Sequence, residues 1–177
     1  FEQLFRALRV LQNNRFPIGR KLAAVSPGGG NTVNLSDAFS EKPHIALPRL
    51  LPETQTALQK LLPEENVDIK NPVDPGAVGV SMLDKLLPVI GCDSGIDALL
   101  MIMSTEFISH FNQEDVRSKV AEGIAGLIAI VAEQIGKPIF VHVVHFRDNN
   151  EEFFHCRKLL LDQLIAQKIP WTDGPLS

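Results

Sequence analysis

Residues 21–32 read KLAAVSPGGGNT, a short apolar run followed by a turn and three consecutive glycines. The run from Leu22 to Val25 has the length and composition of a buried strand. Glycines let the backbone turn sharply and let a ligand approach without a Cβ in the way. A helix that begins after such a turn points its free N–H groups and positive dipole end toward it. The stretch predicts a strand–turn–helix unit that can face an anion. A tight turn that binds nothing explains the same pattern equally well.

Four further runs along the chain are largely apolar. They are residues 45–47, 98–103, 139–144 and 169–171. Continuous apolar strands occur in parallel sheets that are covered on both faces. Helical segments separate the runs, and strands that alternate with helices form right-handed crossovers. We therefore expect an α/β fold with a flavodoxin-like, doubly wound, parallel five-stranded sheet, in the order 2-1-3-4-5, with helices on both faces.

The clearest helix is predicted between the third and fourth of the five apolar runs. Its apolar residues recur every three or four positions, as on the buried face of a helix. They are Val116, Val120, Ile124, Leu127, Ile128, Val131 and Ile135. Asn112 can cap the start of this helix, and Gly136 followed by Pro138 can end it. The next helix is expected to start near Asp148 or Asn149.

The length of 177 residues fits one domain. Near the start of the chain, Leu4, Leu8 and Leu11 recur at helical spacing, with Arg and Gln opposite. We therefore assign residues 1–19 to a leading helix and a connection from a preceding domain, and residues 20–177 to the domain itself. Because the sequence has no initiator Met, we expect it to be part of a longer protein.

Composition excludes several classes of partner and location. The net charge is −4 and no basic run is present, which argues against nucleic acid as a partner. No apolar stretch approaches the roughly 20 residues that a membrane span needs. Cys92 and Cys156 are isolated, which argues against an oxidised, secreted protein. We expect a cytoplasmic protein without a membrane partner, and leave open whether it forms a homo-oligomer.

Several specific chemistries are also excluded by their motifs. No Lys-Ser or Lys-Thr follows the glycines, and Val33 stands where a dinucleotide fingerprint needs its third glycine. The five histidines and two cysteines show no spacing typical of a metal site. His142 and His145 cannot share one face of a strand, because their separation is odd. Glu106, after the third run, is interpreted as a solvated carboxylate.

Residues 71–76 read NPVDPG and form the second marked stretch. Two prolines stiffen it, and the side chains of Asn71 and Asp74 can each bond nearby backbone. A structural turn of the Asx type is the simplest interpretation of the stretch.

Several short stretches, taken in order, resemble one module. They are KLAAVSPGGG at 21–30 with Asp37-Ala38, LLPET at 50–54, LLP at 61–63, NPVD at 71–74, IDALL at 96–100, GKP at 136–138 and KIP at 168–170. Together they resemble the succinyl-CoA-ligase-like flavodoxin domain of the NDP-forming (ADP-forming) acyl-CoA, or acetyl-CoA, synthetase family. The resemblance covers nearly the whole chain. Some members of that family accompany protein lysine acetyltransferases.

The resemblance implies a function for the complete protein. Enzymes of this family interconvert an acid, CoA and ATP with an acyl-CoA and ADP, and Mg is expected with the nucleotide. A histidine becomes phosphorylated in a loop of a neighbouring CoA-binding domain, and an ATP-grasp unit handles the nucleotide. That loop is held between two helix N-termini, one from each flavodoxin-like domain. No histidine here matches the phosphorylated one, so we expect the fragment to bind no cofactor and to be inactive alone.

The resemblance also assigns site residues. Gly28, Gly29 and Gly30 would form the turn of the gripping helix, and Asn31 and Thr32 would provide its first donors. Asn71 and Asp74 would shape the adjacent loop. No catalytic residue and no metal ligand is assigned to this chain.

The chain departs from the family pattern at three places. The family usually reads Gly-Gly-Pro-Gly where this chain reads GGGN at 28–31, and an Asn-Ala or Asn-Ser pair where it has Ser26-Pro27. After the fourth run, HFRDN at 145–149 replaces a Gly pair. A non-catalytic regulatory or assembly module with a degenerate ligase fold is therefore the alternative function. A free flavodoxin-like binder of a phosphorylated small molecule is a third, weaker one.

Overall fold

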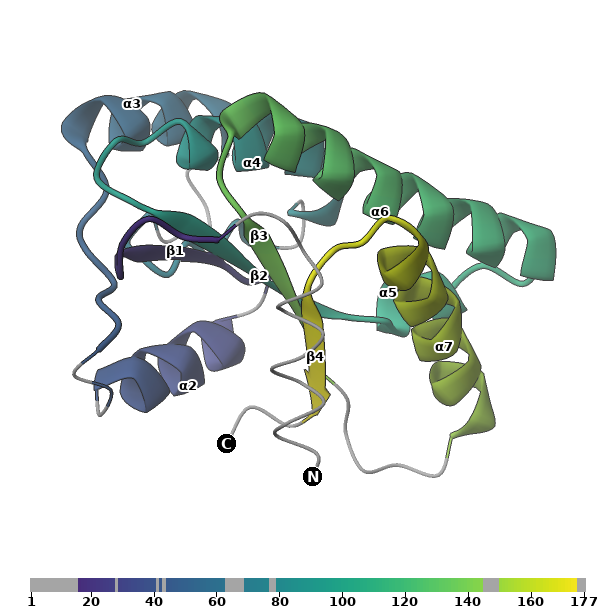
Figure 1. Cartoon of the computed structure of the whole chain (residues 1–177). Coiled ribbons are helices and arrows are strands. Elements are labelled where there is room, and N and C mark those ends of the chain that lie inside the picture. Colours follow the sequence, from purple (N-terminus) through teal and green to yellow (C-terminus); the bar gives the residue numbers. More distant parts are fainter. Residues whose placement is uncertain are drawn as a thin grey trace.

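The computed structural model describes residues 16–27, 29–40, 42, 44–62, 69–76, 79–144 and 150–174. Helices and strands alternate along most of this part of the chain (Figure 1). In order, they are β1 (Leu22–Val25), α2 (Gly29–Ser40), α3 (Pro52–Leu61), the 3-10 helix η2 (Val80–Met82), α4 (Leu83–Gly91), β2 (Ala98–Ser104), α5 (Glu106–Ser109), α6 (Glu114–Ile135), β3 (Ile139–Val144), α7 (Glu151–Ala166) and β4 (Trp171–Gly174). The leading helix expected within residues 1–11 lies outside the described residues. No helix in the described ranges is long and apolar enough to cross a membrane.

The strands form one parallel sheet of four strands in the order β1-β2-β3-β4. Leu22 of β1 lies opposite Ala98 of β2, and Val141 of β3 lies opposite Trp171 of β4. Helices connect each strand to the next, as crossovers between parallel strands require. The predicted α/β class with a parallel sheet is therefore confirmed.

The predicted five strands and the order 2-1-3-4-5 are not observed, because residues 45–47 do not form a strand. Ala46 makes a single parallel bridge to Lys21 at the outer edge of β1. The next donor on that side would be Pro48, which has no N–H and cannot continue the ladder. Further along the same edge, Val73 makes a second isolated bridge to Val25. Two separate segments thus cover the edge that a fifth strand would have covered.

The last strand lies later in the sequence than expected. It was predicted at residues 169–171, but β4 spans Trp171–Gly174. The N–H of Ile169 instead donates to the carbonyl of Leu164 at 2.9 Å, so Ile169 is bonded to the last turn of α7 and not to β3. The end of a buried helix and the start of a buried strand cannot be distinguished from an apolar run alone.

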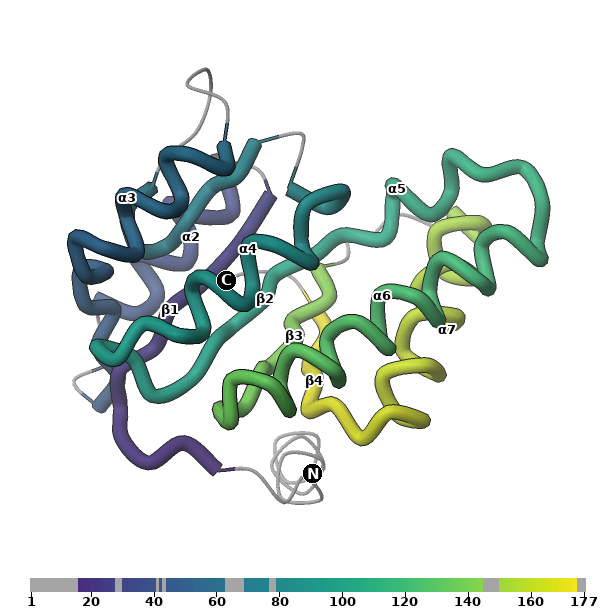
Figure 2. The backbone as a smooth tube through the Cα atoms, turned by 90° about the horizontal axis from the view of Figure 1, so that it is seen from above, coloured from purple at the N-terminus to yellow at the C-terminus, as the bar shows by residue number. Residues whose placement is uncertain are grey.

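The two faces of the sheet pack against different helices (Figure 1). Side chains at odd-numbered strand positions, such as Met101 and Val143, join the main core with residues of α3, α4, α6 and α7. Even-numbered residues point to the opposite face, where Ala24, Ile102 and Val144 pack with Leu35 of α2. Viewed from above, α6 and α7 run beside each other and extend past the strands (Figure 2).

Helix ends follow the predicted signals in part. Helix α6 ends at Gly136, whose φ of 68° is the left-handed conformation that favours glycine at this position. Its start is one residue later than predicted, because Gln113 rather than Asn112 is the N-cap residue and makes no side-chain cap bond. Helix α7 is capped by Asn150, whose side chain accepts from Glu152 N at 2.9 Å and Phe153 N at 3.3 Å. The predicted caps Asp148 and Asn149 lie outside the described residues.

A polar contact joins β1 to the start of β2. The carboxylate Oδ2 of Asp97 accepts a hydrogen bond from Lys21 N at 2.8 Å, and Asp97 N donates to Lys21 O at 2.7 Å. Gly19 lies against this carboxylate, and a Cβ on Gly19 would stand 2.3 Å from Asp97 Oδ2. The contact lies immediately before the first pair of the two strands, Leu22 of β1 and Ala98 of β2.

Candidate functional site

The site predicted from the glycines lies where β1 ends and α2 begins. Ser26 and Pro27 follow the strand, and the first described helical residue is Gly29. Gly28, the first predicted site residue, lies outside the described residues. Ligands of open parallel sheets bind beyond the carboxyl ends of the strands, and this turn occupies that edge.

The first turn of α2 contains Gly29, Gly30 and Asn31. N–H groups in the first turn of an α-helix have no carbonyl partner within the helix. Thr32, the last predicted donor, follows at the fourth helical position, where the N–H normally closes the first intrahelical bond. No acidic side chain lies in this first turn, so no carboxylate there offsets the positive end of the helix dipole.

Ser26 lies buried beneath this turn. The residue is 0% exposed, and its Oγ has no hydrogen-bond partner among the described residues. Its backbone N–H donates to Val73 O at 3.0 Å. The turn is therefore attached to the second predicted stretch, and the structure brings the glycine turn and the 71–76 loop together at one edge.

Asn71 and Asp74 each bond to backbone. The side chain of Asn71 accepts from Ala24 N at 2.9 Å and donates to Leu22 O and Pro48 O at 2.8 and 2.9 Å. Asp74 Oδ1 accepts from Gly76 N at 2.9 Å, which is an Asx turn. Asn71 thus points toward β1, and a role of both residues in shaping the loop beside a ligand stays a prediction.

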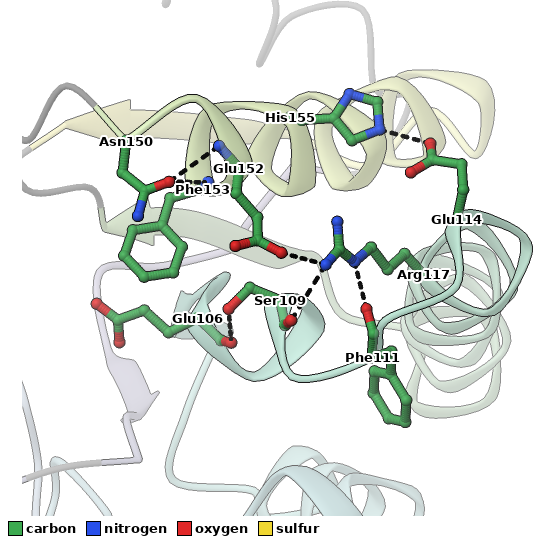
Figure 3. A network of polar contacts seen from close by, with 9 residues as sticks. All are labelled: Glu106, Ser109, Phe111, Glu114, Arg117, Asn150, Glu152, Phe153 and His155. Carbon is green, nitrogen blue, oxygen red and sulfur yellow. Dashed lines mark hydrogen bonds and ion pairs between the residues drawn. The ribbon is translucent and has the colours of Figure 1, made fainter.

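A network of polar contacts joins α5, α6 and α7 near the carboxyl end of β2 (Figure 3). Arg117 of α6 is its centre. The guanidinium donates to Phe111 O at 2.5 Å and to Ser109 O at 3.3 Å, and it forms an ion pair with Glu152 of α7. On the outer side, His155 Nε2 lies 2.5 Å from Glu114 Oε1.

This network was not predicted from the sequence, because Arg117 and Glu152 are 35 residues apart and carry no motif. Glu106, interpreted as a solvated carboxylate, is half-buried and accepts from Ser104 Oγ at 3.0 Å. Arg117 of α6 bonds to one carbonyl at the end of α5 and one in the α5–α6 connection, and pairs with a carboxylate of α7. These contacts form a structural cluster.

The remaining reactive side chains lie apart from the glycine turn. In the described ranges, no three His, Cys, Asp or Glu side chains gather where they could hold a metal ion. Nδ1 of His142 lies 2.8 Å from Thr172 Oγ1, and His145 is outside the described residues. Burial raises the pKa of the Cys156 thiol, while the nearby Arg117 opposes this shift.

No protein family model matches the sequence, and no curated protein matches it either. Solved structures do match. The protein PH0766 from Pyrococcus horikoshii is 19% identical with a TM-score of 0.74, over 99% of this chain and 37% of that one. The acetyl-coenzyme A synthetase 1 from Candidatus Korarchaeum cryptofilum, described as dinucleotide forming, is 22% identical. Its apo form has a TM-score of 0.69, over 99% of this chain and 34% of that one.

The same synthetase in complex with phosphate and ADP has a TM-score of 0.67, over 97% of this chain and 33% of that one. The chain thus spans about a third of the length of these proteins. At these identities the likeness establishes the fold. This chain has the fold of one part of an acetyl-coenzyme A synthetase, the group of proteins that its sequence stretches also resemble.

Proposed function

We propose that this chain is one domain of an NDP-forming acyl-CoA ligase, and that the N-terminus of α2 helps to hold a phosphohistidine loop of a neighbouring domain. One observation carries the proposal. Gly29 and Gly30 open α2 at the carboxyl edge of the sheet, in a chain with the fold of part of an acetyl-coenzyme A synthetase. That synthetase has been solved with phosphate and ADP, which are the kinds of ligand that a helix N-terminus can bind.

Gly30 leaves the start of α2 open to an external ligand. A Cβ on Gly30 would meet no atom within 4 Å, and its φ is outside the left-handed region. Within helices, glycine is less favourable than alanine by up to about 1 kcal/mol. The open space at this position leaves room for a group that approaches the helix from outside.

The strength of one helix end decides what kind of ligand is involved. A helix N-terminus stabilises a partly buried anion by up to about 2 kcal/mol. Alone, this corresponds to a dissociation constant on the order of tens of millimolar. Useful binding therefore requires a second helix end or a cation, which a neighbouring domain would supply.

The surface beside the turn suits a protein loop better than a free anion. Val33 is three positions after Gly30, so both lie on one side of α2. The Val33 side chain is 60% exposed. An exposed apolar residue next to an anion-facing turn offers a contact that inorganic phosphate cannot use.

The proposal divides the complete reaction among domains. The phosphorylated histidine and the CoA site would lie on a neighbouring CoA-binding domain, and ATP or ADP with Mg would lie on an ATP-grasp unit. This chain would contribute backbone N–H groups that hold the phosphoryl group while the loop is docked. No proton transfer or covalent step is assigned to its side chains.

A phosphate titration monitored by the backbone amides tests the site. We expect Gly29, Gly30 and Asn31 to shift first, at tens of millimolar phosphate. Gly30→Val should abolish these shifts, because it places a branched side chain where the anion approaches. Gly123→Val is the matched control, since Gly123 of α6 is exposed and also has open space around its Cβ position. Shifts confined to residues 71–74, or retained in Gly30→Val, would refute the site.

A second measurement separates the ligase from a non-catalytic module. In the complete parent protein, Gly30→Val should lower ATP-dependent phosphorylation of the histidine loop at least tenfold, while Gly123→Val should not. A parent protein that binds phosphate at this turn but never phosphorylates a histidine would favour the regulatory or assembly alternative.

A further inference from the structure

The outer side of α7 carries a stripe of side chains that is largely apolar. Phe154 and Ile165 are 60% and 58% exposed, and Leu161 between them is half-buried. Together with Lys158 they follow one another at steps of four, three and four residues. All four side chains therefore lie within about 60° around the helix axis. Alternating steps of four and three are the spacing of the contact positions in a coiled coil, so the stripe has the pattern of a helix that packs against another helix.

This stripe is separate from the sides of α7 that pack inside the chain. Helix α7 lies beside α6 (Figure 2), and its Glu152 forms an ion pair with Arg117 of α6. The step of two residues from Glu152 to Phe154 turns the helix by about 200°, so the stripe points away from α6. A third side of the helix faces the core, through Cys156, Leu160 and Leu164.

We propose that the stripe binds the same stripe of a second copy of this chain, with the two α7 helices antiparallel. An interface between identical copies has to be complementary to itself. In the antiparallel arrangement, Phe154 of each copy meets Ile165 of the other. Lys158 then lies opposite Leu161, and its apolar stem covers Leu161 while its ammonium group stays at the rim. Each contact is made twice around the two-fold axis.

The charges along α7 select this arrangement. Lys158 Nζ lies 2.7 Å from Asp162 Oδ2 on the same helix, and both side chains are more than half exposed. Antiparallel packing brings Lys158 of one copy next to Asp162 of the other, so the four charges alternate in sign. A parallel pair would place the two Lys158 ammonium groups against each other, which is unfavourable. A single lysine at such a contact position specifies the register and the number of helices, at a cost in stability.

The Phe154 ring is held in place before binding. The guanidinium carbon of Arg157 lies 5.2 Å from the centre of this ring, and the Arg157 side chain also pairs with Asp173 of β4 at 3.9 Å. An aromatic side chain that is already positioned loses less conformational freedom when it binds. Aromatic residues are also enriched at protein interfaces.

The size of the stripe sets the strength of the dimer. It spans 11 residues along α7, which is about 16 Å of helix. Stable interfaces bury roughly 1,600 Å² of surface, and a single stripe of four side chains covers less than this. We therefore expect a reversible dimer with a dissociation constant on the order of 10–100 µM.

Sedimentation velocity of the complete 177-residue chain tests the proposal. From about 1 µM to about 1 mM protein, the sedimentation coefficient should rise from that of a monomer to that of a dimer. Phe154→Gln should weaken the dimer at least tenfold. Ile130→Gln is the matched control, because Ile130 of α6 is 65% exposed and lies outside the stripe. Lys158→Leu should strengthen the dimer at least tenfold, since an apolar residue then completes the stripe.

Disulfide trapping tests the orientation of the two helices. Phe154→Cys and Ile165→Cys are each made in a Cys92→Ser background, because Cys92 is exposed while Cys156 is buried. When the two variants are mixed and oxidised, position 154 of one should be linked to position 165 of the other. Either variant alone should form few linked dimers.

The outcomes are distinct. A chain that stays monomeric over the whole concentration range overturns the proposal, as does equal weakening by Phe154→Gln and Ile130→Gln. Disulfides formed mainly between identical positions would show a parallel pair and overturn the antiparallel arrangement. All the substituted side chains are at least partly exposed, and unchanged far-UV circular dichroism would show that each variant is folded.

Discussion

The side chain of Asn71 bonds to the backbone of β1 beside Ala24, where a neighbouring strand would otherwise pair. Its Oδ1 accepts from Ala24 N at 2.9 Å, and its Nδ2 donates to Leu22 O at 2.8 Å. In a parallel ladder, Pro48 would have served both of these β1 groups, but it has no N–H to donate. The carbonyl of Pro48 bonds to Asn71 Nδ2 instead, at 2.9 Å. One amide therefore replaces two backbone pairings.

Removing this amide should destabilise the fold. Asn71→Ala leaves one donor and two acceptors of the backbone without their partner, and we expect a loss of about 2–4 kcal/mol in the free energy of unfolding. Urea unfolding measures it. Asn71→Asp should cost at least as much, because it places a carboxylate against two carbonyl oxygens. Asn34→Ala, at an exposed position of α2, is the control. A change below about 0.5 kcal/mol for Asn71→Ala would show that water replaces the amide.

The same substitution should have opposite effects at two glycines. A Cβ on Gly91 of α4 would lie 2.5 Å from Ile135 Cδ1 and 2.9 Å from its Cγ2. Because Ile135 is β-branched and stiff, Gly91→Ala should destabilise the fold by about 1–3 kcal/mol. Gly123→Ala, with open space around it, should stabilise α6 by about 0.5–1 kcal/mol. Thermal unfolding midpoints that move in the same direction would contradict this packing of α4 on α6.

Arg117 should contribute more to stability than its ion pair suggests. Its side chain is 13% exposed and also serves the carbonyls of Phe111 and Ser109. We expect Arg117→Met to cost about 1–3 kcal/mol. Glu152→Gln should cost under about 1 kcal/mol, because the Glu152 side chain is 48% exposed. A double-mutant cycle by urea unfolding separates the two terms. Equal losses for both variants would mean that the ion pair alone accounts for the effect.

The two cysteines should differ in reactivity. Cys92 is exposed, while Cys156 is buried on the core face of α7. Burial raises the pKa of the Cys156 thiol, so it stays protonated to higher pH than usual and offers less reactive thiolate. At pH 8, iodoacetamide should label Cys92 rapidly and Cys156 only as fast as the protein opens. Labelling of the Cys92→Ser variant isolates the second rate. Equally fast labelling of both would place Cys156 nearer the surface.

The parts of the fold that the sequence predicted are those carried by local pattern. The run at 98–103 is apolar at every position, and the helix before Gly136 repeats its apolar face over five turns, so both were located. The prediction of a strand at 45–47 was wrong, because the pairing of this segment with β1 is interrupted at Pro48. The β1 groups bond instead to Asn71, which is distant in sequence. Helix α4 was left unplaced, since Pro88 lies inside it and interrupts the usual signal.

In the candidate site too, the features that local sequence encodes were predicted and the contacts between distant residues were not. The position of Gly29 and Gly30 at the start of a helix follows from a strand that ends just before them. The contact of that turn with residues 71–76 depends on the Val25–Val73 bridge, which no local pattern encodes. The Arg117 cluster joins three helices and was missed for the same reason.

The contact of Asp97 with Lys21 has a consequence for how the chain avoids misfolding. Every side chain from Ala98 to Met103 is apolar, so a shift of β2 by one residue would exchange its two faces without burying a single charge. Hydrophobicity alone therefore does not choose between the two alignments. A shift would separate the Asp97 carboxylate from the Lys21 N–H and break this hydrogen bond. A single acidic residue outside the strand thus selects one of two nearly degenerate alignments, and protects the centre of the sheet from slipping.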